Sequence, residues 1–120
     1  MANHTLLSAS SLEGDQVKNR QGEDLGEIKE IMIDTETHSV AYYVLSFGGV
    51  MGIGDDLFAI PPEAMRVDTA EKCFILNVDK KLLKSAEGFD KNNWPDLTDP
   101  KFRQDLYGHY GISQSAQQRH

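Results

Sequence analysis

Residues 40–47 constrain the fold of this chain more than any other segment, because they are apolar at almost every position. Successive side chains of a strand point to opposite faces. Alternation therefore predicts two sets: Val40, Tyr42 and Val44 on one face, and Ala41, Tyr43, Leu45 and Phe47 on the other. A strand with two apolar faces needs cover on both. We expect one face to line a barrel interior. A helix, the tail or a second subunit should cover the outer set, to which we assign Tyr43, Leu45 and Phe47.

Other short apolar segments, separated by polar turns, complete a mainly β pattern. In residues 26–35, Ile31 and Ile33 share a face while Ile28 is out of phase, so we expect a bulge near residues 29–30 that returns all three to the core. A strand over 57–61 and a hairpin over 65–67 and 73–78 follow. Strands of this length and spacing are typical of a small β-barrel or sandwich. The predicted fold is a small β-barrel with a short C-terminal helix.

The last third of the chain has a different character. Residues 80–86 predict a short helix, and Thr98, Asp99 and Pro100 predict the start of a second one over 100–109. Phe102, Leu106 and Tyr110 recur every four residues, which gives that helix one apolar stripe. We therefore divide the chain into a barrel domain, residues 1–88, and a C-terminal extension, residues 89–120, packed on the barrel or on a second subunit.

The net charge and the single cysteine limit which binding partners and which cellular compartment we expect for this protein. The 120 residues carry a net charge of −7, which repels phosphate backbones and anionic lipid unless a local basic patch compensates. The densest basic stretch is Lys80, Lys81 and Lys84, so nucleic acid is an unfavourable partner and membrane insertion is not expected. Cys73 is the single cysteine, and a chain without disulfides favours a reducing compartment. The first residues lack a signal-peptide pattern, and we expect a cytoplasmic protein.

The residue patterns that carry chemistry are not found in this sequence. The four histidines are scattered without ligand spacing: His4, His38, His109 and His120. A calcium loop beginning at Asp90 fails, because its sixth position is Pro95 and its twelfth is Lys101. The glycines of residues 48–54 precede a strand and two aspartates, unlike a phosphate-binding loop. Cys73 reads as a buried apolar residue. We predict no enzyme activity, no cofactor and no metal.

Apolar side chains outside the predicted strands indicate an interaction surface instead. Val50, Met51 and Ile53 form an apolar tip on the glycine-rich connection, and Trp94 is a large aromatic residue in a polar stretch. The predicted surface consists of Val50, Met51, Ile53, Trp94, Phe102, Leu106 and Tyr110. A stripe on one helix and a two-sided strand also favour a homodimer.

Three segments together resemble a known family. Residues 26–34 read Gly-Glu-Ile-Lys-Glu-Ile-Met-Ile-Asp, residues 40–49 read Val-Ala-Tyr-Tyr-Val-Leu-Ser-Phe-Gly-Gly, and residues 58–61 read Phe-Ala-Ile-Pro. This order resembles the PRC-barrel family, which is named for a domain shared by the photosynthetic reaction centre H subunit and a ribosome maturation factor. The tail, with Gly-Phe-Asp-Lys-Asn-Asn-Trp-Pro-Asp at 88–96, is similar to free-standing members described as stress-associated.

The resemblance implies a small β-barrel that serves as a docking or adaptor module without catalytic residues. A homodimeric module that binds an unidentified protein is therefore the function we expect. The alternatives are an RNA- or ribosome-associated accessory factor and a barrel that binds a small ligand. Either alternative requires a basic face or a concave pocket, and the sequence shows neither.

Overall fold

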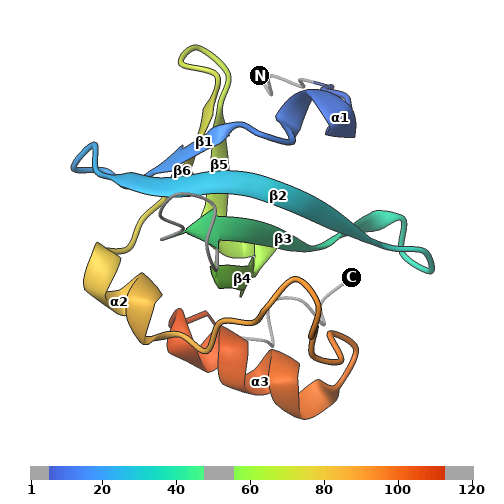
Figure 1. The fold of residues 1–120 in the computed structure, drawn as a ribbon. Coiled ribbons are helices and arrows are strands. Elements are labelled where there is room, and N and C mark those ends of the chain that lie inside the picture. Colours follow the sequence, from blue (N-terminus) through green and yellow to red (C-terminus); the bar gives the residue numbers. More distant parts are fainter. Residues whose placement is uncertain (1–5, 48–55, 113–120) are drawn as a thin grey trace.

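A computed structural model describes residues 6–47 and 56–112 of the protein (Figure 1). Its strands are β1 (Gln16–Lys18), β2 (Asp24–Asp34), β3 (Ser39–Phe47), β4 (Asp56–Ile60), β5 (Met65–Asp68) and β6 (Cys73–Leu76). Its helices are α1 (Ala9–Leu12), the 3-10 turn η1 (Pro62–Ala64), α2 (Lys80–Ser85) and α3 (Pro100–His109). These elements confirm the mainly β fold with a short C-terminal helix.

The six strands form one curled sheet in the order β4-β3-β2-β1-β6-β5. Neighbouring strands are antiparallel except for β1 and β6, which pair in parallel. Figure 1 shows the sheet bending round on itself as a half-barrel, with α1 near one end and with α2 and α3 near the other. Pro61 and Pro62 end β4 because a proline nitrogen cannot donate to a ladder. The chain then turns through η1 into β5, at the opposite edge of the sheet.

The concave side of the sheet holds the main hydrophobic core. Its buried members are Val17, Leu25, Ile28, Leu45, Phe58, Ile60, Phe74, Leu76 and Leu83. Leu83 comes from α2, so this short helix closes the core by inserting one side chain. The Asp79 carboxylate caps the helix by accepting a hydrogen bond from the Leu82 backbone nitrogen at 2.8 Å. Cys73 is buried and unpaired, as expected for a small apolar residue.

The register of β2 on β3 contains two irregularities rather than the single one predicted. The first lies between Ile28 and Glu30 and confirms the expected bulge at Lys29. It places Ile28 in the core and Ile31 against it. The second lies between Met32 and Ile33, where β3 has the additional residue, Ala41. Ile33, near the end of β2, is 52% exposed, so the expectation that it belongs to the core is wrong.

Strand β3 is covered on both faces, as its apolar pattern predicts, but the inner and outer sets are the reverse of those assigned. Leu45 is a buried core residue, and Tyr43 and Phe47 pack against the same core. The Tyr43 ring lies 5.1 Å from the Phe74 ring, edge to face. Tyr42 and Val44 are also buried, and they occupy the convex face. Alternation alone separates the two sets but does not show which one faces inward.

Helix α3 begins and ends close to its predicted bounds. The Asp99 carboxylate is the N-cap and accepts from the Lys101 backbone nitrogen at 3.0 Å, and Pro100 occupies the first helical position. Gly111 adopts a positive φ of 69° just after the helix, a conformation that glycine tolerates. None of the helices within residues 6–47 and 56–112 is long and apolar enough to cross a membrane.

Candidate interaction surface

The C-terminal extension packs on the convex face of the sheet through Tyr42. The Tyr42 hydroxyl donates to the backbone oxygen of Leu97 at 3.0 Å, and its ring meets Phe102 edge to face at 6.1 Å. Burial raises the pKa of the Tyr42 hydroxyl, although nearby Arg103 partly offsets the effect. These contacts join β3 to α3 and to the segment that precedes α3, which contains Leu97. Tyr42 is thereby shielded within a single chain, and Val44, on the same face of β3, is also buried.

The segment after α2 protects the edge of the sheet at β4. Leu57 and Phe89 exchange two backbone hydrogen bonds, of 2.9 and 2.8 Å, and so form a short antiparallel bridge. A β-carbon added to Gly88 would lie 3.0 Å from the Phe58 ring and 3.1 Å from the Leu57 carbonyl oxygen. The close approach of this segment to β4 therefore depends on glycine. Exposed strand edges invite unwanted pairing, and this bridge covers the edge of β4 at Leu57.

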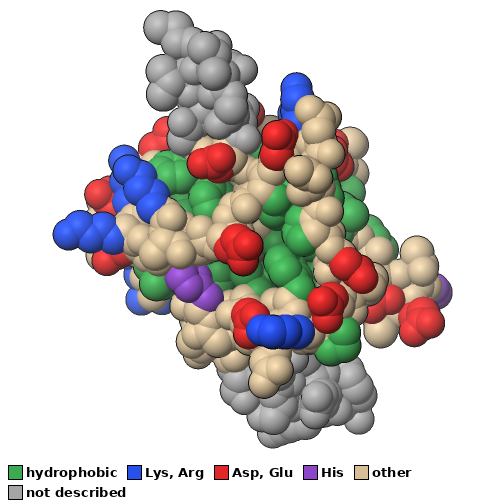
Figure 2. Space-filling view, turned by 60° about the horizontal axis from the view of Figure 1, so that its bottom comes forward, with side chains coloured by type: hydrophobic (Ala, Val, Ile, Leu, Met, Phe, Trp, Pro, Cys, Tyr) green, Lys and Arg blue, Asp and Glu red, His purple; other side chains and the backbone are tan. Residues whose placement is uncertain are grey.

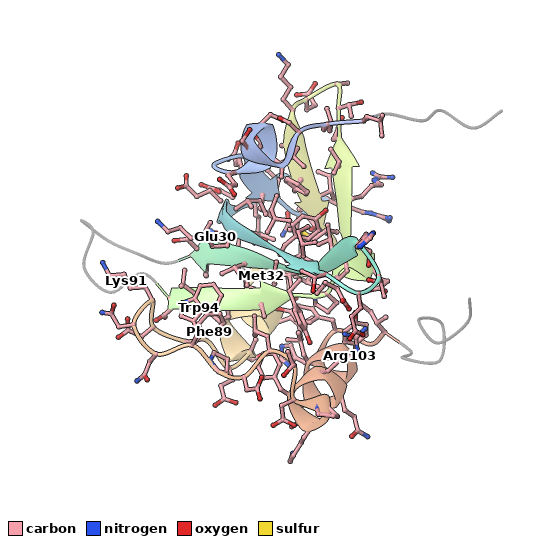
Figure 3. All side chains as sticks on the ribbon, turned by 90° about the vertical axis from the view of Figure 1, so that its right-hand side faces the viewer. Glu30, Met32, Phe89, Lys91, Trp94 and Arg103 are labelled. Atoms are coloured by element: carbon pink, nitrogen blue, oxygen red, sulfur yellow. The ribbon has the colours of Figure 1, made fainter. Side chains whose placement is uncertain are left out.

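Trp94 is held at the surface by Phe89. Their ring centroids lie 5.1 Å apart with an interplanar angle of 59°, and Figure 3 shows the two rings next to each other beside the sheet. Trp94 is 37% exposed, one of four large hydrophobic side chains that the described residues expose. The other three are Leu6, Leu7 and Ile33. Because Phe89 is fixed to β4 through its backbone, Trp94 rests on a rigid base.

Helix α3 contacts the rest of the protein through two side chains that the sequence stripe does not include. Tyr107 is completely buried, and its hydroxyl donates to Glu63 at 2.8 Å. Burial and the Glu63 carboxylate together raise the pKa of this hydroxyl. The Arg103 guanidinium lies over the Tyr107 ring, 4.9 Å from its centroid. At the other end, His109 Nε2 donates to the Leu82 oxygen at 2.9 Å and ties α3 to α2.

The predicted stripe is divided between two environments. Phe102 and Leu106 are half-buried and line surface hollows. Tyr110 packs against the main core, and its hydroxyl is buried without a hydrogen-bond partner among the described residues. The stripe is thus partly a packing face. Tyr107 could have been recognised from a wider stripe, because it follows Leu106 directly on the helix.

We predict that Tyr110→Phe raises the free energy of unfolding by about 1 kcal/mol, since it removes a buried hydroxyl that has no described partner. Tyr107→Phe should lower it by about 1 kcal/mol, because it removes the hydrogen bond to Glu63.

Burial raises the pKa of Tyr110 above its ordinary 10.0. The Tyr110 hydroxyl therefore ionises at lower pH in the unfolded chain than in the folded protein. As a result, the free energy of unfolding falls as the pH rises above about 10. Urea titrations at neutral and alkaline pH should show that this fall in the free energy of unfolding is smaller for Tyr110→Phe than for the wild type. An unchanged or greater fall would contradict the prediction.

A hollow of about 530 Å³ lies between the first turn of α3 and the β2–β3 turn. Tyr42, Met32 and Leu97 supply apolar surface, and the charged residues Arg103, Asp34 and Glu36 also line the hollow. Its lining therefore carries charges of both signs. No preference for one class of ligand follows from it.

The remaining sequence candidates have the following positions. Val50, Met51 and Ile53 lie outside the described residues. The Asp90 carboxylate accepts from the Asn92 backbone nitrogen at 3.2 Å, which is a turn rather than a calcium loop. In the described part of the chain, no three His, Cys, Asp or Glu side chains gather closely enough to hold a metal ion. Phe89, which the sequence analysis did not assign to the interaction surface, supports Trp94.

Comparison with known proteins agrees with this architecture. A search of curated proteins finds no match. The family model described as the PRC-barrel domain matches residues 4–83, which include all six strands and most of α2. The match ends before the segment that carries Trp94 and before α3, so the surface described above lies largely beyond it. Since the matched region covers more than half of the chain, the protein belongs to the PRC-barrel domain family.

Proposed function

We propose that the protein is a non-enzymatic docking module that binds another protein through its C-terminal extension. The observation that carries this proposal is the partly exposed Trp94, whose ring packs at an angle against the Phe89 ring, while the Phe89 backbone is hydrogen-bonded to β4. Membership of the PRC-barrel domain family supports an interaction role for the barrel. In this proposal the barrel is the scaffold and the extension supplies the binding surface.

Trp94 has the properties of an anchor for a protein partner. Tryptophan contributes a large contact area and is enriched among the residues that dominate binding energy. The conformational entropy that the Trp94 side chain loses on binding is small here, because its ring already packs against Phe89, and Phe89 is held in place by its bridge to Leu57. A partner that covered the ring would bury apolar area which water now contacts.

Finer parts of the proposal rest on the sequence. The tail resembles that of free-standing stress-associated members, which supports a stress-related role in the cytoplasm. The two-sided strand favours a homodimer, yet Tyr42 and Val44 are buried within one chain. A dimer would therefore use the exposed surface around Trp94, and its mass can be measured by sedimentation of the purified chain.

The proposal predicts that proteins captured from the source cells by the tagged chain are lost when Trp94 is replaced by alanine. Removal of an anchor residue at an interface typically costs about 2 kcal/mol or more of binding energy, so capture should fall at least tenfold by quantitative mass spectrometry. Leu7→Ala is the matched control, because Leu7 is also exposed but lies beside α1. The proposal fails if Trp94→Ala captures the same proteins at the same level as Leu7→Ala.

A further inference from the structure

A groove runs along α3, on the side that faces the segment after α2. It consists of two hollows, of about 360 and 190 Å³, which share Glu87 and Phe102. The first hollow extends towards Phe89 and Pro95, and the second towards Leu106 and His109. Because two lining residues are common to both, the hollows adjoin each other, and we call the pair the α3 groove.

The floor of the α3 groove is apolar. Its apolar members are Ala86, Phe89, Pro95, Phe102 and Leu106. All five are half-buried, so each is packed on one side and open to solvent on the other. Figure 2 shows hydrophobic side chains in the middle of this face, with acidic side chains bordering them on several sides. An open apolar channel of this kind is typical of a surface that receives side chains from a partner.

The rim of the α3 groove is acidic. Glu87 borders both hollows, Asp90 the first and Asp105 the second, and all three residues are exposed. Lys101 pairs with Asp105 at 2.9 Å and reduces its charge. Among the described residues that line the two hollows, His109 is the only basic one, and it already bonds to Leu82. The local excess is therefore negative, in agreement with the net charge of −7.

We propose that the α3 groove binds a basic, amphipathic segment of a partner protein, with apolar side chains on the floor and Lys or Arg side chains against Glu87 and Asp90. This inference rests on the proposed docking function and specifies the chemistry of the partner. Complementary charge selects a partner and speeds its association, while the apolar floor provides the contact area. Nucleic acid and anionic lipid are disfavoured by the same carboxylates.

Trp94 makes the proposal directly measurable, because it is the only tryptophan and it touches Phe89 on the groove floor. The probe is a synthetic amphipathic peptide of alternating leucine and lysine pairs. A neutral analogue has glutamine, and an acidic analogue has glutamate, in place of lysine. Tryptophan emission gives the affinity of each peptide, and NMR shifts of α3 amides locate the site. We expect the lysine peptide to bind at least tenfold more tightly than either analogue at about 50 mM salt, where surface charges are weakly screened.

The decisive variant is Glu87→Lys combined with Asp90→Lys. It should weaken binding of the lysine peptide by about tenfold or more and reverse the preference towards the acidic analogue. The matched control is Glu13→Lys with Glu71→Lys, which changes the net charge equally at the opposite end of the molecule. Both control positions are exposed, and that protein should bind the lysine peptide almost as the wild type does.

Several outcomes would overturn the inference. Equal weakening by both charge reversals would show attraction to overall charge rather than to the groove. Equal binding of the neutral analogue would show that the rim contributes nothing, and absence of binding would show that the groove has another role. Self-association that is lost in the Glu87→Lys, Asp90→Lys variant would instead assign the groove to a second copy of the chain. If cellular capture depends on Trp94 but is unaffected by that variant, the docking function stands and the basic-partner inference fails.

Discussion

Replacing Gly26 with alanine is expected to lower the free energy of unfolding by about 4 kcal/mol, a large fraction of the stability of a domain of this size. Gly26 has a φ of 116°, which side-chain-bearing residues rarely adopt. A β-carbon at this position would overlap the backbone carbonyl oxygen of Ser46 on β3. Both the conformation and the contact therefore exclude a side chain.

The effect is large because Gly26 lies at a junction of three strands. It belongs to β2, pairs with Val17 of β1 where the register of that pair shifts, and contacts β3 from the other side. Relief of the overlap would require β2 and β3 to separate. Their separation would disturb the neighbouring core residues Leu25, Ile28 and Leu45.

Gly22→Ala is the matched control for this prediction. Gly22 also has a positive φ, of 85°, but nothing lies within 4 Å of an added β-carbon. The substitution should therefore cost only the conformational penalty, about 1 kcal/mol. Urea denaturation followed by circular dichroism measures both variants. Similar losses for the two proteins would contradict the assigned contact between Gly26 and Ser46.

Part of the fold could be predicted because the alternation of apolar residues along the sequence follows the alternation of side chains between the two faces of a strand. Ile28 is out of phase with Ile31, and this mismatch predicted the bulge at Lys29. The second irregularity, before Ile33, leaves no comparable mismatch, because Ile31 and Ile33 alternate as a regular strand would. Only the pairing with β3 reveals it.

The candidate surface was predictable to the extent that it depends on residue type. Trp94 and Phe102 stand out as large aromatic side chains in a polar tail. Phe89 and Tyr107 are aromatic residues of the same tail, but their roles were not predictable, since they arise from contacts with Leu57 and Glu63, which are distant in sequence. The acidic rim likewise brings together Glu87 and Asp105 through the packing of α3 beside the preceding segment. Such proximity is a property of the tertiary fold.

Tyr42 is the residue whose loss should most strongly affect the attachment of the C-terminal extension. Tyr42→Ala removes a buried ring, its contact with Phe102 and its hydrogen bond to Leu97. We expect a loss of about 3 to 4 kcal/mol in the free energy of unfolding. Tyr42→Phe keeps the ring and should cost only about 1 kcal/mol for the hydrogen bond. Urea denaturation of the two variants separates packing from hydrogen bonding.

A double-mutant cycle with Phe102→Ala tests whether this attachment is direct. Aromatic pairs in edge-to-face contact contribute about 0.5 to 1.5 kcal/mol beyond their buried area, so the two substitutions should be less than additive by that amount. Strict additivity would show that the rings do not stabilise each other. Because Trp94 and the α3 groove both lie on the extension that Tyr42 secures, Tyr42→Ala should also abolish binding of the lysine peptide, whereas Tyr42→Phe should retain it. Retained binding in Tyr42→Ala would mean that the surface is formed without its attachment to the barrel.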